Sequence, residues 1–151
     1  MADELNGFDL ELRMAVYRHF ARTAGSPTLD MMRQHLGASE QDITDGYRRL
    51  YARRLLVPAG DFSSIRMAPP FSGVPTQHRV RVNDIDYFAN CAWDALGVVS
   101  ALGGTGDVSS RCEHTSDPLM LHLTPDGPSG SSWLFHCAVP ASRWWNDIVF
   151  T

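Results

Sequence analysis

A cluster of prolines near the middle of the chain divides the sequence into two halves with different patterns. Three prolines fall within residues 69–75, inside the segment Met67–Thr76. Proline lacks the backbone N–H that helices and sheet ladders use, and it restricts the conformation of the residue before it. This segment is therefore predicted to be an irregular or polyproline-like linker, which no helix or strand crosses from one half into the other.

The first half has the periodicity of helices. Leu12, Val16 and Phe20 recur at every fourth position, which is typical of an amphipathic helix that buries one face. The sequence Gly-Ser-Pro at 25–27 breaks this helix. A second helix is predicted over residues 29–36.

Residues with capping side chains mark the second and third helices. Thr28 precedes the second helix, and Gly37 follows it. Ser39, with Asp42 three residues later, resembles a capping box in which Asp takes the usual place of Glu. A third helix is predicted over about residues 40–55, and the residues expected to be buried on it are Ile43, Tyr47, Leu50 and Tyr51.

The second half has shorter periodic segments. Residues 78–82 alternate in polarity and predict a strand. Residues 84–102 predict a helix, with Asn83 or Asp84 as its cap and two glycines as its end. Further short strands are predicted at 108–112, 119–123 and 133–139, with a turn at 125–128. This half is therefore expected to be one helix packed on a small, mostly antiparallel sheet.

Together the two halves predict an α+β fold. Residues 1–66 would form a three-helix, winged-helix-like subdomain. Residues 67–82 would form the proline-rich linker and the first strand, and residues 83–151 a core of one helix on a small sheet. A chain of 151 residues is long enough for one domain of ordinary size or two small subdomains.

Charge and composition narrow the range of partners. The formal net charge of −4 argues against a protein that bulk charge holds on nucleic acid. No apolar run approaches the ~20 residues that a membrane-spanning helix needs. The first four residues, Met1–Glu4, lack the basic-then-apolar pattern of a signal peptide, so a cytoplasmic protein is expected.

A DNA-binding alternative rests on arginines of the predicted third helix. A DNA-reading helix would carry its phosphate contacts at this place, and the arginines concerned are Arg48, Arg49, Arg53 and Arg54. Residues 1–60 contain eight arginines against eight acidic residues, so this half has no net positive field. A solvated helix face is therefore the better interpretation.

A cysteine and a carboxylate stand three residues apart in the predicted helix of the second half. On a helix, Cys91 and Asp94 would lie on one face, among apolar and aromatic neighbours. Such surroundings make a carboxyl costly to ionise, so the pKa of Asp94 is expected to rise. A thiol beside a carboxylic acid can act as a nucleophile with a proton donor. Spacing alone nevertheless favours the alternative of a packed cysteine and an exposed aspartate.

The other two cysteines have several interpretations. Three cysteines, an odd number, argue against a disulfide framework, and each is most often a small buried apolar residue. A zinc site is an alternative, although the spacing of its four donors matches no standard finger; the donors would be Cys112, His114, His136 and Cys137.

A family resemblance rests on the cysteine motifs. The run Cys91–Leu96, followed by Val108–Cys112 and the strand at 119–123, resembles the organomercurial lyases, also called alkylmercury lyases. Those enzymes carry a Cys-x-x-Asp helix and then a Ser-Ser-x-Cys strand at this separation. The segment Met67–Thr76 and the three-helix lead-in are also similar to the family, so the resemblance covers nearly the whole chain.

The resemblance implies protonolysis of a carbon–mercury bond. Mercury(II) is a soft cation that prefers thiolates to oxygen or nitrogen donors. By resemblance, Cys91 is the thiol that captures the organomercurial, Asp94 is the proton donor, and Cys112 is a structural cysteine. The partner would be a small-molecule organomercurial, with Hg(II) as the bound product and no cofactor required.

One feature of the family has no match in this sequence. The family places its second catalytic cysteine near the C-terminal end, and the sequence ends at Thr151, before a matching residue. Cys137 is the spare thiol and the candidate second metal ligand beside Cys91. Two other functions stay open: Cys/Asp chemistry on another small organic substrate, and a non-enzymatic winged-helix, metal-sensing regulator that binds DNA.

Overall fold

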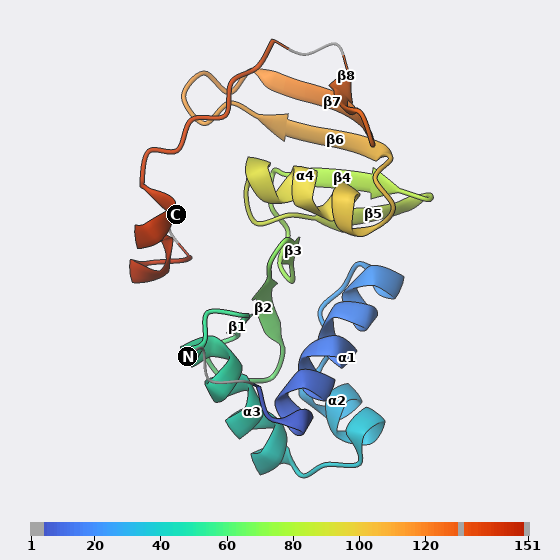
Figure 1. Ribbon diagram of the computed structural model, residues 1–151, viewed down its shortest axis with the longest axis vertical. Coiled ribbons are helices and arrows are strands. Elements are labelled where there is room, and N and C mark those ends of the chain that lie inside the picture. Colours follow the sequence, from blue (N-terminus) through green and yellow to red (C-terminus); the bar gives the residue numbers. More distant parts are fainter. Residues whose placement is uncertain (1–4, 130–131, 150–151) are drawn as a thin grey trace.

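Three helices open the chain, and each begins at a capping side chain (Figure 1). The computed structural model describes residues 5–129 and 132–149. Helix α1 spans Gly7–Thr23, α2 spans Leu29–Leu36 and α3 spans Glu40–Ala52. The caps predicted at Thr28 and Gly37 and the capping box of Ser39 with Asp42 are confirmed. The first four residues, on which the signal-peptide prediction depends, and Thr151 lie outside the described ranges.

The predicted apolar faces of these helices form their core, with one exception. Leu12, Val16 and Phe20 are fully buried, and so are Ile43, Tyr47 and Leu50 on α3. The predicted burial of Tyr51 is wrong, because this side chain is 47% exposed. A helix turns once in 3.6 residues, which puts Tyr51 at the edge of the buried stripe, and its ring lies 6.2 Å from that of Trp145.

A three-stranded antiparallel sheet follows the helices. Its strands are β1 (Val57–Pro58), β2 (Ile65–Ala68) and β3 (Phe71–Ser72), in the order β1-β2-β3. The predicted irregular linker is therefore wrong for residues 67–72, which form most of the β2–β3 hairpin. Pro69 and Pro70 occupy the turn of this hairpin, where the ladder needs no N–H donor. The predicted subdomain boundaries at residues 66 and 82 stay predictions.

A five-stranded sheet forms the second half, and one helix packs on it (Figure 1). The strand order is β5-β4-β6-β7-β8, and every pair is antiparallel. Helix α4 (Ala92–Ala101) contacts β4 and β6. The predicted α+β fold with a helix on an antiparallel sheet is confirmed; the strands are β4 (Arg79–Val82), β5 (Ile85–Phe88), β6 (Gly106–Arg111), β7 (Pro118–Thr124) and β8 (Gly127–Ser129).

The predicted helix over residues 84–102 is wrong for its first eight residues. Asn83 and Asp84 both have positive φ, 49° and 61°, and Val82 pairs with Ile85 across them. Two consecutive residues of positive φ make the tight turn that joins hairpin strands, and Asn and Asp tolerate this conformation better than most residues. They therefore end β4 and start β5, and α4 begins only at Ala92.

The predicted strand at 133–139 is also wrong. Residues 132–137 belong to no strand, and the chain continues into a 3₁₀ helix, η1 (Ala141–Asn146). The strand that follows β7 in the sheet is β8, which begins inside the predicted turn at 125–128. The aromatic residue Phe135 instead contacts Trp93 of α4, so the apolar pattern reflects side-chain packing rather than strand pairing.

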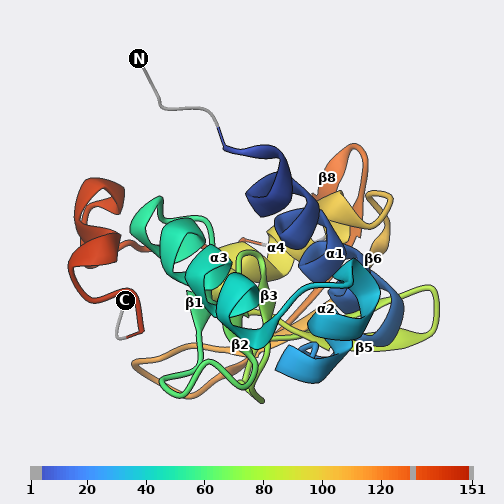
Figure 2. The ribbon, with the colours of Figure 1, turned by 90° about the horizontal axis from the view of Figure 1, so that it is seen from below.

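One apolar core joins the two halves. The ring of Phe71 in β3 is stacked 5.7 Å from Phe20 of α1 and lies 5.8 Å from Tyr87 of β5. The Tyr87 hydroxyl donates to the backbone oxygen of Ala21 at 2.7 Å. Viewed from below, the three N-terminal helices group together, with α4 behind them (Figure 2). Within the described residues, no helix has the length and apolar character that a membrane crossing requires.

Replacement of Gly73 by alanine tests the close approach at the β2–β3 hairpin. A Cβ on Gly73 would lie 1.9 Å from the backbone oxygen of Ile65, which cannot rotate away. We expect Gly73→Ala to lower the free energy of unfolding by about 1–3 kcal/mol in urea denaturation. Gly60→Ala is the matched control, because a Cβ there meets no atom within 4 Å. Equal unfolding midpoints for the two variants would contradict this account.

Candidate functional site

Cys91 caps the helix that carries Asp94. The backbone of Cys91 is extended, with φ −148° and ψ 178°, and its Sγ accepts a hydrogen bond from the Asp94 N–H at 3.4 Å. Cys91 therefore precedes α4 rather than lying inside a helix as predicted. Because the capping side chain turns back over the first helical turn, the thiol and the carboxyl-bearing residue still lie together. Both residues are partly buried.

Asn90 fixes the carboxyl of Asp94 and ties the site to the β2–β3 hairpin. Its Nδ2 donates to Asp94 Oδ2 at 2.9 Å. The same amide donates to the backbone oxygens of Pro70 at 3.3 Å and Phe71 at 3.2 Å. The sequence analysis missed Asn90, and no sequence pattern could have found it, because its partners are set by how β3 meets the start of α4.

A glycine in α4 allows the helix to pack closely against the turn of the β2–β3 hairpin. A Cβ on Gly97 would lie 3.0 Å from Cβ of Pro70, tighter than ordinary packing. The absence of a side chain at Gly97 thus lets α4 come down onto the hairpin turn. This packing helps to bury the first turn of α4, where the candidate residues lie.

Burial sets the protonation of both candidate residues. It raises the pKa of Asp94, and the hydrogen bond from Asn90 opposes the rise. The pKa of Cys91 is raised by burial first and then by the negative charge of Asp94. Backbone N–H groups at the start of α4 oppose that rise. The direction of the shift agrees with the sequence-based expectation of a raised Asp94 pKa, and burial favours the neutral form of both the thiol and the carboxyl.

The other two cysteines lie in different surroundings. Cys112 follows β6 in a turn in which its N–H donates to the oxygen of Asp117 at 2.9 Å. Hydrogen bonds from Thr115 lower the pKa of the Cys112 thiol. Cys137 is exposed and close enough to Cys91 for its negative charge to raise the Cys91 pKa. The three cysteines therefore differ in exposure: Cys91 and Cys112 are partly buried, and Cys137 is exposed.

The zinc alternative has no support from the geometry. Within residues 5–129 and 132–149, no three His, Cys, Asp or Glu side chains gather where they could hold a metal ion. The four donors proposed from sequence therefore do not form a site.

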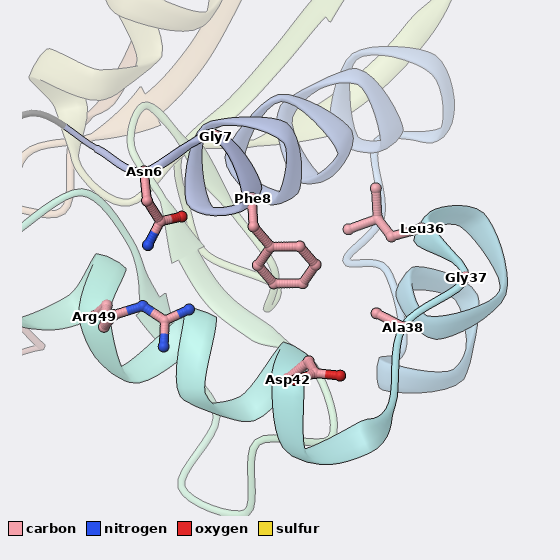
Figure 3. Close-up of a pocket in the computed structure, with 8 residues that line it drawn as sticks. All are labelled: Asn6, Gly7, Phe8, Leu36, Gly37, Ala38, Asp42 and Arg49. Atoms are coloured by element: carbon pink, nitrogen blue, oxygen red, sulfur yellow. The ribbon is translucent and has the colours of Figure 1, made fainter.

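Two cavities formed by the described residues have no cysteine in their lining. One, of about 600 Å³, lies between the start of α1 and the α2–α3 turn (Figure 3). The other, of about 470 Å³, is lined by residues of β4 and β6 and the segment before β4. Neither is lined by Cys91 or Asp94. The Cys91 site is instead flanked by the indole of Trp93, which is 54% exposed.

Two of the arginines considered for DNA contacts have acidic partners. The guanidinium of Arg49 holds Asp9 with two hydrogen bonds, at 2.8 and 2.7 Å, and Asp9 is only 1% exposed. Arg48 pairs with Asp45 at 2.6 Å. The Asp9–Arg49 pair joins α1 to α3, so this arginine has a structural role.

Comparisons with known proteins indicate the family and the fold of the chain. Residues 71–151, slightly more than half of it, match the family described as alkylmercury lyase. No curated protein matches the sequence. Among solved structures, the crystal structure of the mercury-bound form of MerB2 superposes with a TM-score of 0.68 at 20% identity. The match covers 85% of this chain and 62% of that chain, and at this identity it shows a shared fold.

Replacement of Asp94 by asparagine tests the cost of its buried charge. Because the folded pKa lies above the ordinary value of 3.8, the folded state holds its proton to higher pH than the unfolded state. Stability therefore falls as the pH rises through this interval. We expect Asp94→Asn to have the higher free energy of unfolding at neutral pH, and the advantage to vanish in acid.

The measurement is urea unfolding across pH, with Asp126→Asn as a control at an exposed aspartate. A stability difference between wild type and Asp94→Asn that stays constant with pH would contradict the assignment of a raised pKa.

Proposed function

The chain belongs to the alkylmercury lyase family, and we propose that it cleaves the carbon–mercury bond of an organomercurial by protonolysis. In this proposal, Cys91 binds mercury and Asp94 supplies the proton. One observation supports it: Cys91 caps the helix turn that carries Asp94, so a soft ligand and a carboxyl with a raised pKa lie within one helical turn. The mercury-bound state of MerB2, which shares the fold, is consistent with this assignment.

Capture of the substrate begins at the Cys91 sulfur. Mercury(II) is soft, so the organomercurial cation R–Hg⁺ binds the sulfur in preference to nearby oxygens. The S–Hg bond forms as the thiol proton leaves to solvent. The N–H of Asp94 and the positive end of α4 stabilise negative charge on the sulfur during this exchange, against the cost of burial.

Asp94 then protonates the carbon. Burial raises the pKa of its carboxyl and so favours the acid form, and Asn90 donates to Oδ2, which leaves Oδ1 to carry the proton toward the substrate. The electron pair of the C–Hg bond takes up this proton, and the hydrocarbon R–H leaves. Mercury stays on Cys91 as Hg(II), and Asn90 stabilises the carboxylate that forms. No change of oxidation state occurs, and no resident cofactor is required.

Trp93 and Phe135 supply an apolar surface beside the reacting atoms. Their ring centroids are 5.5 Å apart, and both side chains are about half exposed. An organic group on mercury can lie against these rings and displace water from the carboxyl. Less water around Asp94 keeps its proton available for carbon rather than for solvent.

Replacement of Cys91 by serine tests the capture step. We expect Cys91→Ser to release no benzene from phenylmercury in a single turnover beyond what added thiol alone releases, because a hydroxyl is a poor ligand for mercury. Cys112→Ser is the matched control and should release benzene as the wild type does. Cys91-dependent binding without benzene release would indicate a family member that captures but does not cleave. Wild-type release by Cys91→Ser would exclude the proposed mechanism.

Replacement of Asp94 by alanine tests the proton donor. We expect Asp94→Ala to bind phenylmercury with the stoichiometry of the wild type but to release benzene at least about 100-fold more slowly, the usual effect of losing a general acid. In the wild type, release from the preformed complex should decline as the pH rises through the raised pKa of Asp94. Equal release rates for the two proteins would remove Asp94 from the reaction.

A further inference from the structure

A cavity on the five-stranded sheet carries two arginines on the face that points away from α4. Helix α4 packs on the other face, where the paired residues Val80 of β4 and Val108 of β6 belong to the apolar core. Successive side chains of a strand point to opposite faces. Arg79, one residue before Val80, therefore points away from α4, and so does Arg111, three residues after Val108. Both arginines are exposed, and both line one cavity of about 470 Å³.

Neither of these arginines forms an ion pair with a described acidic side chain. The next arginine of β4 differs, because Arg81 pairs with Asp86 at 3.4 Å. The guanidinium of Arg79 instead lies over the ring of Phe88, 5.7 Å from the ring centroid. This contact favours the cation but supplies no carboxylate to neutralise it. Within the described residues, two positive groups without an acidic partner therefore line the same cavity.

A buried hydrogen bond holds the wall that carries the two arginines. His78 Nδ1 and Ser110 Oγ lie 2.7 Å apart, and both residues are almost fully buried. Each of them directly adjoins one arginine of the cavity in the sequence, and Arg79 also pairs with Ser109 in the β4–β6 ladder. The arginines thus project from a fixed backbone. A preformed wall of this kind lowers the ordering cost of binding a ligand.

We propose that this cavity binds phosphate, either free or as the phosphate group of a small organic molecule. Guanidinium groups donate paired N–H groups to phosphate oxygens, and Arg79 and Arg111 can share the oxygens of one phosphate. A carboxylate is satisfied by a single guanidinium, so two arginines favour the anion with more oxygens. Ser109 and Gln77 add polar residues to the lining, and the volume lies in the range of small-molecule sites. Because the cavity is on the face away from α4, this inference does not rest on the proposed function.

One acidic side chain stands close to this cavity. Glu113 accepts a hydrogen bond from Nε2 of Gln77, which lines the cavity, and its Oε1 lies 3.9 Å from Nε2 of His78. Glu113 is exposed, so water screens its charge, but a nearby negative charge still opposes the binding of an anion. Removal of this charge should therefore have the opposite effect from removal of either arginine.

Titration with inorganic phosphate at constant ionic strength tests the site. The protein is labelled with the NMR-active nitrogen isotope, and the Nε–H signals of its arginines are followed in wild type, Arg79→Gln, Arg111→Gln and Arg81→Gln. We expect saturable shifts in wild type and an at least about 10-fold weaker phosphate affinity in Arg79→Gln and Arg111→Gln, because each loses a charge-assisted hydrogen bond. Arg81→Gln removes the same charge from the same strand and should bind phosphate within about 2-fold of wild type.

Further ligands and one further variant complete the test. Glu113→Gln should bind phosphate about 3-fold more tightly than wild type, because it lacks the nearby negative charge. Circular dichroism should show that all the variants, which change exposed side chains, stay folded. Tighter binding of phenyl phosphate than of inorganic phosphate would support an organic phosphate as the ligand, and equal affinity would support phosphate itself. The proposal is overturned if wild type shows no saturable binding, if Arg79→Gln and Arg111→Gln keep wild-type affinity, or if acetate binds as tightly as phosphate.

Discussion

The aromatic packing around Phe71 joins the two halves of the protein. Its ring is stacked on Phe20 of α1 and contacts Tyr87 of β5, so one side chain joins the helical half to the five-stranded sheet. Its backbone pairs with Ala89 in an isolated bridge, and its oxygen accepts from the Asn90 amide. Burial of large aromatic rings contributes more stabilisation than most other contacts, so this cluster can hold the neighbouring polar groups in place.

The aromatic cluster around Phe71 also helps to position the candidate site. Because Asn90 is held on two backbone oxygens of the hairpin, the carboxyl of Asp94 has a fixed donor at one oxygen. The same packing withdraws the first turn of α4 from water and raises the pKa values of Cys91 and Asp94. A neutral acid beside a thiol is the state that a protonolysis reaction needs at its start. The fold thus favours the acid form of Asp94 more than water does.

Sequence patterns predict correctly those features that depend only on neighbouring residues in the chain. Caps at Thr28, Ser39 and Gly37 were predictable because a cap depends on residues within one helical turn. The same kind of signal is misleading at residues 84–91, where an apolar run predicts the start of a helix. There, Asn83 and Asp84 at positive φ make a hairpin instead, and β4 supplies the partner strand. The same limit applies at residues 133–139, whose apolar side chains reach α4 rather than a neighbouring strand.

Sequence patterns alone predict the α+β class, the three N-terminal helices, the Cys91–Asp94 pair with the raised pKa of Asp94, and the likeness to alkylmercury lyases. Each of these follows from spacing within a short segment or from a motif. The packing of distant segments sets three other relations: Cys91 caps α4, Asn90 donates to Asp94, and Phe135 contacts Trp93. These relations join residues from β3, α4 and the coil after β8. The packing of Phe71 and the contact of Trp93 with Phe135 bring those segments together, and no local pattern encodes such contacts.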